Sequence, residues 1–179
     1  MTEKLEDLFQ RYICLKKICQ NAQDRASNPA DKYAQMISLP LSGKKSDDRK
    51  KEINKYFDEL QIRMDDLFFL DIVAYFEQIV FKKINNASGK IKAIVKEKYT
   101  RPEPFNIIAA SFIKNETDIY SLRNLHNLLE NHIPEYLSEQ FASIIEHRNF
   151  IAHGGRIGKL SMFSVKDIVT ILEQILEYI

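Results

Sequence analysis

The feature that most constrains this fold is the spacing of apolar residues, which recur at intervals of three and four along most of the chain. Leu5, Leu8, Tyr12, Leu15 and Cys19 show this spacing near the N-terminus. Such spacing places side chains on one face of a helix. The sequence has no alternating apolar and polar pattern of the kind that marks half-buried strands. The chain is therefore predicted to be all-α.

Length and composition predict one helical domain spanning residues 1–179. A chain of 179 residues with 45% hydrophobic content is long enough to bury one core. The first helix is expected to end at Asn28-Pro29, because proline interrupts helices. Residues 38–51 contain Pro40, Gly43 and many charges, and they are predicted to form a mobile polar linker.

Further helices are predicted across the rest of the chain. A long helical region from about 47 to 86 is expected to break near Gln61 and to end at Ala87-Ser88-Gly89. Ser164 and Asp167 resemble a capping box at the start of the last helix, although aspartate replaces the usual glutamate or glutamine. The remaining predicted helices cover residues 90–98, 105–114, 119–131 and 134–153.

Charge and hydropathy exclude several classes of protein. The formal net charge is +1, which argues against a general nucleic-acid coat protein, because such binding needs many cationic contacts. A local cationic cleft remains compatible with this charge. The N-terminus lacks the pattern of a signal peptide, and the apolar run 67–81 is too short to span a bilayer. We therefore expect a cytoplasmic protein without a membrane partner.

Polar chemistry is concentrated at the end of the predicted helix 134–153, in the segment Arg148-Asn149-Phe150-Ile151-Ala152-His153-Gly154. Asn149 and His153 are four residues apart, so the amide can reach and orient the imidazole. An arginine fork binds phosphate through paired hydrogen bonds. Gly154 suits the left-handed residue that ends a helix. A basic last turn closed by glycine is also ordinary helix capping, so a structural role stays open.

This segment resembles the motif of the HEPN superfamily, and its Arg-Asn-x-x-Ala-His-Gly form is typical of the prokaryotic branch that includes RiboL-PSP-type proteins. The resemblance also covers the apolar segment 66–77, which ends in Glu77. It implies an α-helical bundle of the HEPN type, a symmetric homodimer, and two motifs that face one cleft. Many members of the superfamily are metal-independent endoribonucleases, and others are catalytically silent binding modules.

The activity that we expect is cleavage of RNA by attack of the ribose 2′-hydroxyl at a composite site in the dimer interface. His153 would act as general base and Arg148 would stabilise the charged phosphoryl group. Asn149 and Glu77 are expected to support them. A salt bridge from Glu77 to Arg148 would anchor the guanidinium, but pairing with a lysine or a solvated position is an equally open role for Glu77.

Two other functions remain open at this stage. One is a silent module that binds RNA or a nucleotide, and the other is a helical protein-interaction module in which Arg148 and His153 are capping residues. The resemblance also suggests a toxin or an anti-phage defence effector, with an antitoxin or another restraining protein as a partner. We expect no metal and no cofactor, because the sequence has neither zinc-ligand spacing nor a phosphate-binding glycine loop.

Two other histidine segments are less promising as functional sites. Arg123-Asn124-Leu125-His126 echoes the motif, but its histidine comes two residues too early. We interpret this segment as the solvated side of a packing helix. His147 precedes Arg148 and would face another direction, so it is predicted to lie at the surface.

Overall fold

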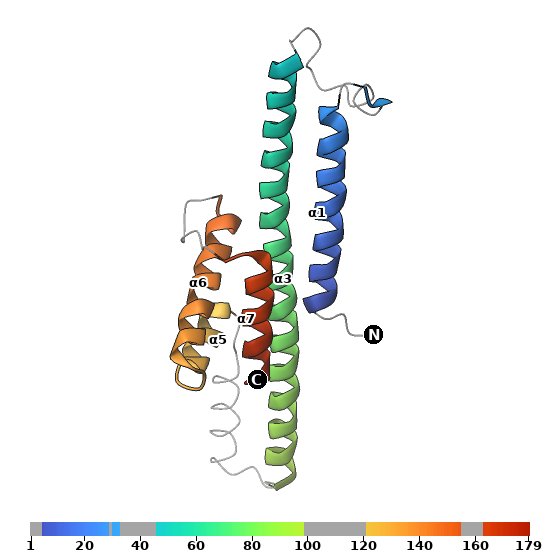
Figure 1. Cartoon of the computed structure of the whole chain (residues 1–179). Coiled ribbons are helices and arrows are strands. Elements are labelled where there is room, and N and C mark those ends of the chain that lie inside the picture. The colour runs from blue at the N-terminus through green and yellow to red at the C-terminus, as the bar shows by residue number, and fades with distance from the viewer. Residues whose placement is uncertain (1–4, 29, 33–45, 99–120, 155–162) are drawn as a thin grey trace. The chain divides into compact units, whose positions relative to one another are not determined.

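The computed structural model describes residues 5–28, 30–32, 46–98, 121–154 and 163–179. These ranges contain helices and no strand, which confirms the predicted all-α class. The helix predicted over 105–114 lies outside the described residues. The helices are α1 (Leu5–Ser27), α3 (Ser46–Lys98), α5 (Leu122–Leu129), α6 (Glu135–Ala152) and α7 (Val165–Glu177) (Figure 1).

The chain divides into two compact units, Met1–Asp71 and Ile72–Ile179, and the single domain expected from its length and composition stays a prediction. The boundary between the units falls within α3. Helix α3 begins at Ser46, so residues 46–51 of the predicted linker are helical. The rest of that predicted linker, residues 38–45, lies outside the described residues.

Helix α3 is one continuous helix of 53 residues, about 80 Å long at 1.5 Å per residue. The breaks predicted near Gln61 and at Ala87-Ser88-Gly89 are therefore wrong. A glycine in a helix costs only about 1 kcal/mol relative to alanine, and Ser88 is buried. Lysine, alanine and isoleucine around Gly89 support the helix, so one weak position does not end it.

In the first unit, α1 runs alongside the N-terminal part of α3 (Figure 1). The buried residues of α1 come once every seven positions, at Leu5, Tyr12, Cys19 and Ala26. Cys19 and Ala26 belong to one cluster with Ile53 and Phe57 of α3. Leu15 of the predicted apolar face is 45% exposed, because contact with a single neighbouring helix covers only a narrow stripe.

A polar cluster joins the same two helices. The Tyr12 hydroxyl donates to Asp65 Oδ1 at 2.7 Å, and Lys16 Nζ forms an ion pair with Asp65 Oδ2 at 3.2 Å. The Asp65 carboxylate thus has a lysine and a phenol as its partners. This contact fixes the register of α1 against α3.

In the second unit, the C-terminal part of α3 packs with α6 and α7 around an apolar core. The core residues Phe76, Leu137, Phe141, Ile144, Leu172 and Ile175 are 0% exposed. Lys83 Nζ of α3 donates to the carbonyl oxygen of Leu176 in α7 at 3.4 Å. The predicted capping box is confirmed, since Ser164 and Asp167 bond reciprocally at the start of α7.

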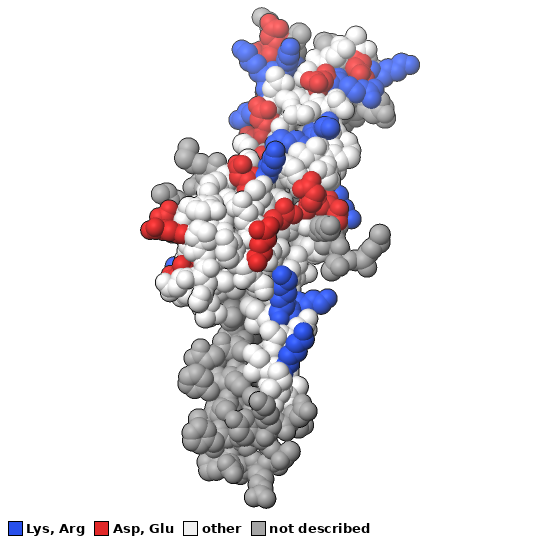
Figure 2. All heavy atoms as spheres, turned by 60° about the horizontal axis from the view of Figure 1, so that its bottom comes forward, with Lys and Arg blue, Asp and Glu red and all other residues white. Residues whose placement is uncertain are grey.

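The surface has no single dominant sign of charge on the face drawn in Figure 2. Acidic and basic side chains both appear there, with apolar and uncharged residues between them. This view agrees with the net charge of +1. Among the described helices, none has the length and apolar character needed to cross a membrane.

Candidate functional site

Three of the four predicted site residues, Arg148, Asn149 and His153, lie at the C-terminal end of α6, and Glu77 lies in α3. The helix ends at Ala152, and His153 is its C-cap residue. The His153 amide donates to the carbonyl oxygen of Asn149 at 3.0 Å. Gly154 has a φ of 61°, which confirms the left-handed residue predicted at the end of this helix. The helix therefore ends three residues after Asn149.

A cavity of about 270 Å³ adjoins this end of α6. It brings together three of the predicted site residues, Glu77 of α3 with Arg148 and Asn149 of α6. The remaining lining residues are Ser121, Leu122, Arg123 and Ile145. Three helices and the N-cap residue of α5 thus converge on one small site. His153 is not among the lining residues, and its side chain is exposed.

The contacts within the motif differ from the predicted ones. Arg148 Nη1 donates to Asn149 Oδ1 at 3.2 Å, so the amide oxygen holds the guanidinium. From the sequence, this amide was predicted to orient the imidazole of His153. Helix geometry permits both partners for Asn149, and the half-buried arginine takes the amide oxygen. Arg148 is therefore the residue that Asn149 positions here.

Glu77 interacts electrostatically with Arg148 across the cavity. Burial raises the pKa of the Glu77 carboxyl above its ordinary value, and the positive charge of Arg148 lowers it by a smaller amount. Within the part of the chain that the structure describes, no ion-pair contact joins the two side chains. Glu77 and Arg148 therefore attract each other over a longer range than a salt bridge. Glu77 lines the cavity together with Arg148.

The raised pKa of Glu77 predicts how stability depends on pH. The folded protein disfavours the Glu77 carboxylate relative to the unfolded chain, so this residue lowers the free energy of unfolding as pH rises through its folded-state pKa. Glu77→Gln removes that effect. Urea unfolding followed by circular dichroism should show the variant gaining stability over wild type as pH rises from 4.5, the ordinary carboxyl value, through the raised folded-state pKa. Glu173→Gln, at an exposed position on α7, should show no such gain. A constant difference between Glu77→Gln and wild type would contradict this assignment.

Arg123 is the lining residue that sequence reasoning missed. It is exposed and lies in the first turn of α5, directly after Ser121 and Leu122. The Ser121 side chain caps this helix by accepting from the Asn124 amide at 3.2 Å. Serine is a preferred N-cap residue, although this helix was predicted from the sequence to begin at residue 119. The proximity of α5 to Arg148 depends on tertiary packing, which the local sequence does not encode.

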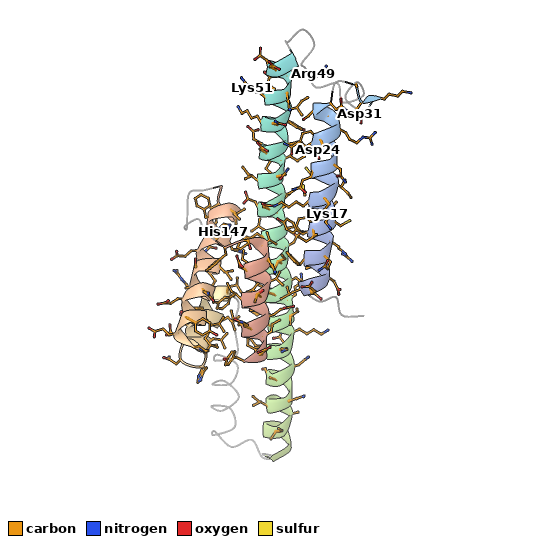
Figure 3. The ribbon with its side chains drawn as sticks, viewed as in Figure 1. Lys17, Asp24, Asp31, Arg49, Lys51 and His147 are labelled. Carbon is orange, nitrogen blue, oxygen red and sulfur yellow. The ribbon has the colours of Figure 1, made fainter. Side chains whose placement is uncertain are left out.

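Two other histidines of this unit, His126 and His147, are at least partly buried. His126 is half-buried, and its Nε2 lies 3.0 Å from the Ser138 hydroxyl. It therefore links α5 to α6, which corrects the predicted solvated position. His147 of α6 (Figure 3) is only 8% exposed, so the predicted surface position is wrong. It follows Ile144 by three residues, which places it on the buried face of α6.

A second, larger cavity of about 960 Å³ lies in the first unit, along α1 and α3. Its lining is almost wholly polar and includes Asp24 (Figure 3), Asn54 and Gln61. Gln61 Nε2 donates to Gln23 Oε1 at 3.0 Å. These side chains hydrogen-bond mainly to one another across the two helices. The lining has no concentration of positive charge comparable with the site at Arg148.

The residues that line the smaller cavity include two arginines, a glutamate, an asparagine and a serine. Guanidinium groups bind phosphate and carboxylate groups strongly, so this lining suits an anionic group. Among the described residues, no group of three or more His, Cys, Asp or Glu side chains is placed to hold a metal ion. No protein-family model, no curated protein and no solved structure matches this chain.

Proposed function

We propose that this protein is an endoribonuclease of the HEPN type that cleaves RNA without a metal ion. The observation that carries the proposal is the position of Arg148, which lines a cavity with Glu77 and Asn149 and lies five residues before His153. RNA transesterification needs a cation that stabilises the phosphoryl oxygens and a base that removes the 2′-hydroxyl proton. Arg148 and His153 are suited to these two roles. The resemblance of the segment 148–154 to the HEPN motif supports the same activity.

In the proposed reaction, His153 removes the proton from a ribose 2′-hydroxyl, and the freed oxygen attacks the adjacent phosphorus. The bond between phosphorus and the 5′-oxygen breaks. A second acid protonates the leaving 5′-oxygen, which leaves a 2′,3′-cyclic phosphate on one product and a 5′-hydroxyl on the other. Arg148 stabilises the negative charge that gathers on the phosphoryl oxygens through paired hydrogen bonds.

A symmetric dimer is part of this proposal, because one motif supplies one imidazole and the reaction needs a base and an acid. A two-fold axis would bring a second Arg148 and a second His153 to the site. Cleavage of cellular RNA would make the protein a toxin or an anti-phage defence effector that acts in the cytoplasm. An antitoxin or another protein would then restrain it.

The test is cleavage of mixed RNA by purified protein in EDTA, which removes divalent metal ions. Wild type should produce fragments with 2′,3′-cyclic phosphate ends, and His153→Ala should cleave about 100- to 10,000-fold more slowly, the range for loss of general acid–base catalysis. His132→Ala is the matched control, because His132 is also exposed and lies between α5 and α6. Equal cleavage by both variants would contradict the proposed role of His153.

One observation favours the silent module as a second candidate. His153 is exposed and does not line the cavity that contains Arg148, as expected for a site that binds an anion without cleaving it. A folded, dimeric wild-type protein that binds RNA through Arg148 and leaves every RNA in the mixture intact would favour this candidate over the nuclease.

A further inference from the structure

Two arginines that are far apart in the sequence lie at the same cavity. Arg123 comes from the first turn of α5, and Arg148 comes from α6. The opposing charge in the lining is the single carboxylate of Glu77. When all three groups are ionised, the lining carries one positive charge in excess. Like charges that share a small site repel each other, and an anion between them would relieve that repulsion.

The start of α5 adds to the positive potential of the cavity. Ser121 accepts from the Asn124 amide, while the amides of Leu122 and Arg123 have no acceptor among the described residues. Free amides in a first helical turn, together with the helix dipole, favour negative charge nearby. The positive potential of these amides is weaker than that of the two arginines. It comes from the same helical turn as Arg123 and also favours an anion.

Glu77 offsets part of the positive charge of the cavity lining. Its carboxylate lies within the electrostatic reach of Arg148 and lowers the local excess of positive charge. The same carboxylate would repel an incoming anion. We therefore expect Arg123 and Arg148 to strengthen anion binding and Glu77 to weaken it.

We propose that this cavity binds one phosphate group of a nucleotide unit, held between Arg123 of α5 and Arg148 of α6. A site of about 270 Å³ lies just below the range of roughly 300–1,000 Å³ that is typical of drug-sized ligands, so it suits one nucleotide unit. The identification of RNA as the source of that phosphate rests on the proposed function. The new assignment is Arg123. We call Arg123 and Arg148 together the phosphate clamp, and both residues come from one chain.

The decisive experiment measures RNA binding in the His153→Ala protein, so that the proposed activity does not consume the ligand. Fluorescence anisotropy with a short labelled single-stranded RNA gives the affinity. Adding Arg123→Ala or Arg148→Ala should each weaken binding by about 10- to 100-fold, as for the loss of a charge-assisted hydrogen bond. Adding Glu77→Gln should strengthen binding. Lys166→Ala, which removes an exposed positive charge from α7, should have little effect.

Salt dependence separates a phosphate contact from a structural effect. Each lost contact to a single strand lowers the slope of log affinity against log salt by about 0.7, so Arg123→Ala should show this decrease and Lys166→Ala should not. Competition with a mononucleotide and with inorganic phosphate distinguishes the sources of the phosphate. Full displacement by a mononucleotide at low concentration would assign the site to free nucleotides instead of an RNA strand.

The outcomes separate this inference from the proposed nuclease. Binding that depends on Arg123, in a protein that never cleaves RNA, supports the phosphate clamp and contradicts the enzyme. Wild-type cleavage with Arg123→Ala as active and as tightly binding as Lys166→Ala contradicts the clamp and leaves the enzyme intact. Absence of binding to RNA, mononucleotide and inorganic phosphate, with thermal unfolding like that of wild type, also overturns the clamp.

Discussion

Replacing Arg148 with alanine is expected to lower the rate of RNA cleavage by about 100- to 1,000-fold, the loss seen when one donor to a developing oxyanion is removed. The guanidinium is half-buried at the cavity and is held by Asn149 Oδ1 at 3.2 Å, so little reorganisation is needed when charge develops on the phosphate. Single-turnover cleavage with enzyme in excess measures this step directly.

Two further variants test whether the planar geometry of the Arg148 guanidinium, and not only its charge, contributes to the cleavage rate. Arg148→Lys keeps the positive charge but loses the planar pair of donors, so we expect it to recover only a small part of the lost rate. Arg63→Ala removes an exposed arginine from α3 and should cleave like wild type. If Arg148→Lys were as active as wild type, Arg148 would act as a simple counter-charge and the proposed bidentate contact would be wrong.

Replacing Phe141 with alanine is expected to lower the free energy of unfolding by about 3–5 kcal/mol, the usual cost of removing a buried aromatic ring. Phe141 is 0% exposed. Its ring packs edge-on against Phe76 of α3 at 5.7 Å between centroids, and it contacts His126 of α5 at 5.8 Å. The loss should therefore combine lost burial with the loss of packing that joins α6 to two other helices.

Urea unfolding followed by circular dichroism measures the effect of Phe141→Ala. Tyr136→Ala is the matched control, since Tyr136 lies on the same helix and is 56% exposed, and it should lose far less stability. Phe141→Leu should fall between them because it keeps part of the apolar volume. Equal losses in Phe141→Ala and Tyr136→Ala would show that the ring contributes little to the core.

The sequence predicted the elements that depend on local patterns. The helical spacing around Tyr12, the capping residues Ser164 and Asp167, and the glycine at position 154 each act within one or two turns of helix. Their physical causes are side-chain periodicity, a reciprocal hydrogen bond and a left-handed backbone. A salt bridge from Glu77 to Arg148 was considered because a buried carboxylate needs a positive partner. The structure brings both residues to one cavity without that ion pair.

The features that the sequence did not predict depend on tertiary packing or on sums of small effects. Arg123 belongs to the cavity only because α5 packs against α6. The continuity of α3 through Gly89 depends on many favourable positions that together outweigh one unfavourable residue. His147 was predictable in principle, because its spacing from Ile144 marks the buried face of α6. The HEPN resemblance remains a prediction, to be tested by the cleavage experiments.

The narrow contact between α1 and α3 has a consequence for local opening of the chain. Only one α1 residue in seven is buried in the first unit, so each turn of the helix loses little apolar contact when it separates from its neighbour. Elements with few buried contacts open at a lower free energy than the global unfolding of the protein. The backbone amides of α1 should therefore exchange their protons with solvent before those of α6 and α7.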